Sequence, residues 1–141
     1  MSVDKKEFDY QDKDIIEFGN KIEDSRGFIQ AISDLEMKSA SVIFTKKNQW
    51  RANHYHKKDW HFIYVTKGSF EYYFRKTNSS EKIKKIIVNV GQVLFTGNMI
   101  DHAMYYTTET EILVLSKNPR DRKTYEDDTV RIDFMNDKNR F

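Results

Sequence analysis

From Lys21 onward the chain consists of short apolar stretches, each long enough for one β-strand and too short for a helix. These stretches are rich in β-branched and aromatic residues, and they are separated by Asn, Gly and Ser residues that favour turns. Short strands at close spacing are typical of an antiparallel sandwich or barrel, so we expect an all-β fold. The predicted strands are Phe28–Ile32, Ala40–Phe44, Phe62–Val65, Phe70–Phe74, Ile83–Val90, Val93–Phe95 and Ile112–Leu115, with a further alternating stretch at Thr129–Phe134.

The length of 141 residues suits one domain with a single core. Residues 1–20 are rich in charge and lack periodicity, which predicts a loose arm that adds at most one edge strand. We therefore expect an arm at 1–20, a barrel at 21–134 and a short tail at 135–141.

The charge and residue content of the chain exclude several classes of protein. The 24 basic and 22 acidic residues are well mixed, so we expect no nucleic-acid partner. Because the chain has no cysteine, disulfides and thiolate metal ligands are excluded. No apolar run approaches the ~20 residues needed to span a bilayer, and the polar N-terminal stretch lacks the apolar core of a signal peptide. We expect a cytoplasmic protein with no membrane contact and a small-molecule partner.

Three of the four histidines lie within eight residues, and the fourth, His102, follows 41 residues after His61. On a strand, His54 and His56 point to the same face, and a turn through residues 57–59 can return His61 on the adjacent strand. Converging imidazoles suit a divalent transition metal such as zinc, iron, nickel or copper. The lack of a carboxylate at these positions argues against magnesium and calcium.

The spacing of the histidines resembles the two sequence motifs of the cupin superfamily. His54-x-His56 followed after four residues by His61 resembles the first motif, which has a glutamate where His61 stands. Gly91 and His102 resemble the start and the histidine of the second motif. The resemblance implies a cupin-type double-stranded β-helix, an antiparallel jelly-roll barrel, in which the four histidines share one site.

The histidine at position 61 leaves the chemistry of that site open, because it removes the anionic ligand of the motif. Some cupins that are similar in this respect bind a metal through histidines alone. Others have lost the metal and use a histidine as a base. The resemblance therefore implies either a divalent transition metal held by His54, His56, His61 and His102, or a site without metal.

Three short segments are similar to nucleotide-sugar epimerases and ketoisomerases of the cupin fold, in particular to the dTDP-4-keto-6-deoxyhexose 3,4-ketoisomerases. This resemblance extends over roughly residues 22–134. It implies an isomerase or epimerase of nucleotide-linked keto-deoxyhexoses in surface-polysaccharide biosynthesis. The segments are Asp24-Ser25-Arg26-Gly27, Arg51-Ala52-Asn53-His54-Tyr55-His56-Lys57-Lys58 and Tyr125-Glu126-Asp127-Asp128-Thr129-Val130-Arg131.

The same resemblance implies roles for individual residues. Arg26 and Arg51 would bind the diphosphate of the substrate, for which the guanidinium fork is well suited. One histidine of the His54/His56 pair would remove a proton next to the keto group, and we favour His56 if the site holds no metal. Candidates for proton donation, or for contact with the sugar and its base, are Tyr64, Tyr72 and Tyr106, and strand parity from His102 points Met104 and Tyr106 inward.

Two other functions fit the same residues. A small iron(II) cupin dioxygenase would use His54, His56 and His102 as ligands, with His61 as a further ligand or beside them. A non-enzymatic cupin that binds a small ligand or a metal would need the same pocket. In each case we expect a homodimer, because an exposed strand edge in so small a barrel is a liability that pairing covers.

Overall fold

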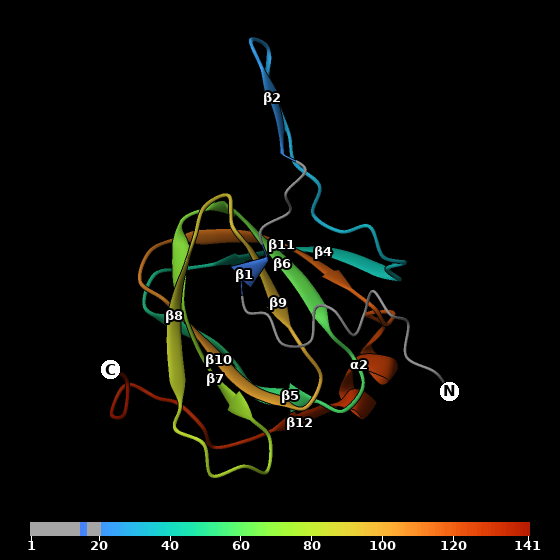
Figure 1. Cartoon of the computed structure of the whole chain (residues 1–141). Coiled ribbons are helices and arrows are strands. Elements are labelled where there is room, and N and C mark those ends of the chain that lie inside the picture. The colour runs from blue at the N-terminus through green and yellow to red at the C-terminus, as the bar shows by residue number, and fades with distance from the viewer. Residues whose placement is uncertain (1–14, 17–20) are drawn as a thin grey trace.

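The computed structural model describes residues 15–16 and 21–141 and is built mainly from two five-stranded antiparallel sheets (Figure 1). The sheets face each other as a jelly-roll barrel, which confirms the predicted all-β cupin architecture. The first sheet contains, in spatial order, β1 (Ile15–Ile16), β9 (Val93–Thr96), β6 (His61–Lys67), β11 (Thr110–Ser116) and β4 (Ser39–Thr45). The second contains β12 (Thr129–Arg131), β5 (Gln49–His56), β10 (Ile100–Tyr106), β7 (Ser69–Lys76) and β8 (Lys84–Asn89).

The main core fills the space between the two sheets. Every second residue of β11 is buried, as expected for a strand with one face on a core. Large apolar and aromatic side chains from both sheets interlock there and close one half of the barrel. The buried members of this core are Ile63, Val65, Phe70, Tyr72, Phe74, Val88, Leu94, Met104, Tyr106, Ile112 and Val114.

Six of the predicted strands correspond to β4, β6, β7, β8, β9 and β11, whereas the stretch predicted at 28–32 is a strand only as far as Ile29. Strands β5 and β10 were not among the predicted apolar stretches, because both carry histidines and other polar side chains. The sequence also predicted no helix, yet residues Arg122–Asp128 form α2, capped by the Asp121 side chain, which accepts from the Thr124 N–H. No helix in the described part of the chain is long and apolar enough to cross a membrane.

A separate hairpin of β2 (Ile22–Asp24) and β3 (Gly27–Ile29) stands away from the barrel (Figure 1). The carboxylate of Asp24 holds its turn together by accepting from both the main-chain N–H and the guanidinium of Arg26. The apolar side chains of this hairpin are exposed to solvent. The hairpin therefore gains little from packing within its own chain.

The strand predicted at 129–134 is shorter in the structure, where β12 ends at Arg131. Strand β12 pairs with β5 of the same chain and forms one edge of the second sheet. After β12 the chain crosses the outer face of the second sheet, where Phe134 and Met135 pack against Tyr73 and Tyr105. This packing covers the outer side of the strands that carry the histidines.

Candidate active site

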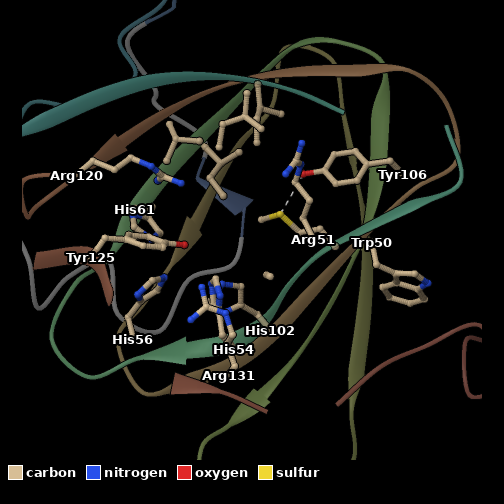
Figure 2. Close-up of a pocket in the computed structure, with 16 residues that line it drawn as sticks. Trp50, Arg51, His54, His56, His61, His102, Tyr106, Arg120, Tyr125 and Arg131 are labelled. Atoms are coloured by element: carbon tan, nitrogen blue, oxygen red, sulfur yellow. Dashed lines mark hydrogen bonds between the residues drawn. The ribbon is translucent and has the colours of Figure 1, made fainter. Parts of the chain in front are cut away.

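One cavity of about 270 Å³ lies between the inner faces of the two sheets (Figure 2). The first sheet lines it mainly with aliphatic side chains together with His61, and β5 and β10 of the second sheet line it mainly with polar ones. An apolar pocket with a few convergent polar groups is the usual form of a small-molecule site. The principal polar residues around it are Arg51, His54, His56, His61, His102, Tyr106, Arg120, Tyr125 and Arg131.

The structure brings all four histidines together at one end of this cavity, as the spacing predicted (Figure 2). The ring centroids of His54 lie 4.6 Å from His56 and 4.8 Å from His102. His61 was expected on a strand adjacent to β5, and this expectation was wrong: the turn after β5 carries the chain to the opposite sheet. His61 therefore faces His56 across the barrel, with 4.8 Å between ring centroids.

A β-bulge in β5 places Arg51 in the cavity. Ala52 and Asn53 both have positive φ, at 68° and 56°, and the register with β10 shifts at this point. His54 pairs with His102, but Arg51 pairs with Met104, so residues three apart on β5 face the same side. Simple alternation from His54 would have pointed Arg51 away from the site. Its guanidinium donates to Thr45 Oγ1 at 2.6 Å and to the Phe44 carbonyl at 3.2 Å.

Hydrogen bonds define the tautomer of His56. The Thr129 hydroxyl donates its one proton to the Tyr125 carbonyl at 2.6 Å, so its oxygen accepts from Nδ1–H of His56, 3.3 Å away. A carboxylate oxygen of Asp128 lies 3.5 Å from the same Nδ1 and favours a proton there. The neutral ring then keeps its lone pair on Nε2, a buried atom without a hydrogen-bond partner among the described residues.

His102 has the same tautomer for a simpler reason. Its Nδ1 lies 2.9 Å from the Ile100 carbonyl, which can only accept, so Nδ1 carries the proton and Nε2 the lone pair. His61 differs, because its Nδ1 lies 2.6 Å from the Ser116 hydroxyl, which can donate or accept. An oxygen of Asp59 lies 3.7 Å from that Nδ1, which places a carboxylate beside the histidines where the sequence predicted none.

The surroundings keep all four imidazoles neutral. Burial is the main cause, and it lowers the pKa of His54 to about 2 and the pKa values of His56 and His102 to about 4. Burial also holds the pKa of His61 well below its usual value. The positive charge of Arg120 adds to the effect on His54, His56 and His61. Near neutral pH these rings are therefore hydrogen-bonding bases or ligands rather than cations.

Comparison with known proteins identifies the family. A family model described as "FdtA: WxcM-like, C-terminal" matches residues 11–138. The chain belongs to this family. The match confirms the resemblance on which the sequence-based prediction relied. No curated protein matches the chain significantly.

Several solved structures share the fold of this FdtA-family chain. A double mutant of the QdtA 3,4-ketoisomerase from Thermoanaerobacterium thermosaccharolyticum, in complex with TDP, has 25% sequence identity and a TM-score of 0.66, covering 80% of this chain and 83% of that one. A 3,4-ketoisomerase from Helicobacter canadensis has 24% identity and a TM-score of 0.66, over 80% and 86%. WlaRA, a TDP-fucose-3,4-ketoisomerase from Campylobacter jejuni, has 21% identity and a TM-score of 0.68, over 84% and 87%.

The cavity of this FdtA-family chain is also lined by three other residues that were predicted to act at the site, namely Arg51, Met104 and Tyr106. Figure 2 shows Arg51 and Tyr106 at the end away from His56 and His61. Burial raises the pKa of Tyr106 to about 12, so its phenol stays protonated. The hydroxyl of Tyr106 donates its proton to the Met104 sulfur at 3.3 Å, at the far end of the cavity from His56.

The other three predicted substrate contacts do not line the cavity, so these predictions were wrong. Tyr64 is separated from His61 by an odd number of positions on β6, so it points to the outer face, where it packs on the cluster around Trp60. Tyr72 is part of the closed core, with its hydroxyl 3.2 Å from Thr96 Oγ1. Arg26 lies in the exposed hairpin turn and is paired with Asp24.

The sequence reading assigned no role to Arg120, Tyr125, Asp128 or Arg131, although all four lie at the site. The last three fall in residues 125–131, whose sequence is similar to that of sugar-modifying enzymes, but this similarity did not indicate a role for any one of them. Arg120 lies in a polar connection that carries no such signal. The ring of Tyr125 lies 5.6 Å from that of His56, and Arg131 is paired with Glu126.

The donor set also fits a metal. Nitrogen atoms of His54, His56 and His102 lie within 4.8 Å of one another, and so do ligand atoms of His56, Asp59 and His61. The four histidines at this end of the cavity thus form two overlapping groups of possible ligands that share His56. In both His56 and His102 the atom free for a ligand is Nε2, because Nδ1 is already bonded within the protein.

Proposed function

We propose that this protein is a nucleotide-sugar 3,4-ketoisomerase acting on a TDP-linked 4-keto-6-deoxyhexose. The observation that carries the proposal is the buried Nε2 of His56, which has a lone pair, lines a sugar-sized cavity and lacks a partner among the described residues. The names of the similar solved proteins support this choice, since they are TDP-sugar ketoisomerases. The comparisons give no support to a dioxygenase.

In this mechanism the keto group moves from C4 to C3 of the sugar by proton transfers alone. Nε2 of His56 removes the proton from C3, and the resulting enediolate is reprotonated at C4. A C–H bond breaks at C3 and another forms at C4, while a hydroxyl proton passes from O3 to O4, so there is no net oxidation. As His56 becomes an imidazolium, Thr129 accepts from its Nδ1–H, and the nearby Asp128 carboxylate stabilises its charge.

The cavity sets the orientation of the substrate. A volume of about 270 Å³ holds a sugar ring but not a whole nucleotide sugar, so the nucleotide must extend outward. Arg51 lies at the end away from the histidines and, among the described residues, donates hydrogen bonds only to neutral oxygen atoms, so its charge is available to a phosphate. We assign the diphosphate to Arg51 and the keto group to the histidine end.

The test uses TDP-4-keto-6-deoxyglucose, the ligand of a solved QdtA mutant with 21% identity. Wild-type protein should convert it to the 3-keto isomer, and in D₂O the product should carry deuterium at C4, both visible by NMR. His56→Asn should lose turnover by more than about 10³-fold, because the base is gone. His54→Asn, beside it but without the Thr129 contact, should keep more activity. Absence of turnover in the wild type would overturn the proposal and favour a binding protein.

We also propose that His54, His56 and His102 can bind a divalent transition metal such as zinc. Such an ion would supply a Lewis acid able to polarise a carbonyl. Nε2 of His56 can hold a metal or accept a proton but not both, so added zinc should inhibit the isomerase and raise the melting temperature of the protein. His54→Gln should weaken both effects. An unchanged melting temperature at saturating zinc would contradict the metal proposal and would not affect the isomerase proposal.

The same proposal places the protein in the cytoplasm as a homodimer that supplies a modified deoxyhexose for surface-polysaccharide synthesis. One structural neighbour, CapF of Staphylococcus aureus, is named as a capsular polysaccharide assembling protein, although this chain spans only 27% of it. Activated sugars are made from cytoplasmic nucleotides, which supports the location. The exposed apolar side chains of the hairpin support a dimer.

A further inference from the structure

Arg120 brings a positive charge to the histidine end of the cavity (Figure 2). It lies in the short connection between β11 and α2. The backbone just before it is fixed at two points: the Asn118 N–H donates to Asp59 at 3.0 Å, and the Asn118 carbonyl accepts from Ser39 at 2.9 Å. Because Asp59 also lies 3.7 Å from Nδ1 of His61, the turn before Arg120 is held to the histidine end of the cavity.

The three arginines of the cavity differ in what their guanidinium groups contact. Arg131 forms a two-bond ion pair with Glu126, at 2.8 and 3.0 Å, so its charge is compensated. Arg51 donates to two neutral oxygen atoms at the other end of the cavity. The Arg120 guanidinium instead lies 4.7 Å above the ring of Tyr125, and within the described residues it forms no ion pair or hydrogen bond, although its charge also acts on the Asp59 carboxyl. Its N–H donors are thus available to a ligand.

The location of Arg120 indicates which part of the substrate it contacts, the diphosphate or the reacting carbonyl. A diphosphate at the histidine end would block approach of the sugar to His56, and Arg51 already serves the opposite end. The reacting carbonyl, in contrast, must lie close to His56. The ring of His56 lies 5.6 Å from that of Tyr125, and the Arg120 guanidinium lies 4.7 Å above the same tyrosine ring. The additional lowering of the His56 pKa by the charge of Arg120 agrees with this proximity.

We propose that Arg120 is a catalytic residue that stabilises the negatively charged enediolate oxygen formed when His56 removes the substrate proton. The inference rests on the proposed isomerase function. Loss of the C3 proton leaves an electron pair that delocalises onto the C4 oxygen, and the guanidinium donates to this oxygen until C4 is reprotonated. An interaction that strengthens as charge develops lowers the barrier more than it tightens substrate binding.

The experiment compares Arg120→Gln and Arg120→Lys with wild type on TDP-4-keto-6-deoxyglucose, and measures TDP affinity by calorimetry. Arg120→Gln should lower kcat by about 10²- to 10³-fold, the usual effect of removing one oxyanion donor, and leave KM and TDP affinity within about threefold. Arg120→Lys should retain intermediate activity, and guanidinium ion should partly rescue Arg120→Gln. The matched control is Arg122→Gln, an exposed arginine on α2, which should behave as wild type.

Each other outcome counts against the inference. An active wild type with equal kcat in Arg120→Gln would remove Arg120 from catalysis and leave the isomerase standing. A raised KM and weakened TDP affinity at unchanged kcat would make Arg120 a diphosphate ligand instead. A wild type without turnover would overturn the isomerase and this role together. Arg120→Lys guards against misfolding, since it keeps the charge and the contact with Tyr125.

Discussion

At the residue scale, Thr129 decides which nitrogen of His56 can act as a base. Its hydroxyl is committed to the Tyr125 carbonyl and can only accept from Nδ1–H. Thr129→Val removes this acceptor, and a hydrogen bond of about 1.4 kcal/mol biases a tautomer about tenfold. We therefore expect kcat to fall about tenfold with KM unchanged, measured by steady-state kinetics. Thr129→Ser keeps the hydroxyl and should restore kcat; a Ser variant as slow as Val would contradict the role.

Another residue-scale prediction concerns Glu71, whose carboxylate accepts two bonds from Arg140 and one from Tyr73. Burial alone would raise its pKa, but these bonds outweigh burial and hold the pKa below the ordinary 4.5. Ionised Glu71 thus stabilises the fold above pH 4.5, and this contribution disappears as the pH falls through the lowered pKa.

Glu71→Gln should therefore lower the free energy of unfolding near neutral pH by about 1–2 kcal/mol, a modest value because Arg140 is partly exposed. The deficit should shrink as the pH is lowered below 4.5, which urea denaturation at several pH values would measure. Glu109→Gln, at an exposed pair with Lys67, is the control and should change little at any pH. A deficit of Glu71→Gln that does not depend on pH would rule out the ionic explanation.

At the scale of elements, the bulge in β5 is strained at Ala52. This residue has φ of 68°, which costs an L-amino acid with a Cβ about 1–2 kcal/mol, and glycine adopts it freely. The added flexibility of glycine in the unfolded chain offsets part of the gain. We expect Ala52→Gly to stabilise the protein by about 0.5–1 kcal/mol in urea denaturation.

Asn53→Gly is the matched variant at the neighbouring position of the bulge. Asn53 also has positive φ, but asparagine tolerates that conformation, and its side-chain oxygen accepts from the Met135 N–H at 2.9 Å. Asn53→Gly should therefore destabilise the protein. If both variants had the same sign, backbone strain at Ala52 would not be the cause.

The same bulge shows what the sequence could and could not predict. Alternation along β10 correctly pointed Met104 and Tyr106 inward from His102, because that strand alternates regularly. Arg51 was assigned to the site from the family resemblance and does line it, whereas alternation from His54 would have pointed it outward, because an inserted residue is invisible in a pattern of residue types. Arg120 was missed for a different reason: its place at the site depends on long-range contacts of the Asn118 turn, which leave no local pattern.

At the scale of the whole molecule, the barrel buries its core well but leaves apolar side chains exposed on the hairpin and on β4. Phe28 and Ile29 of β3 are 54% and 72% exposed, and Val42 of β4 is 69% exposed. Strand β4 is the edge of its sheet, and an isolated two-stranded hairpin is marginally stable in water. If the hairpin of one copy lies on the β4 edge of a second copy, the strand edge is covered and the hairpin gains packing. This motivates the proposed homodimer.

This arrangement predicts that wild-type protein sediments at twice the mass of the chain, and that Phe28→Glu shifts it toward monomer, because a charge cannot be buried unpaired in such an interface. Sedimentation equilibrium over a range of concentrations measures the change. The control is Ile87→Glu on β8, an edge strand of the opposite sheet whose isoleucine is 47% exposed. It should leave the dimer intact, because the predicted contact involves β3 and β4 only. Dissociation by Ile87→Glu but not by Phe28→Glu would place the interface at β8 instead. A wild type that stays monomeric would contradict the proposed homodimer.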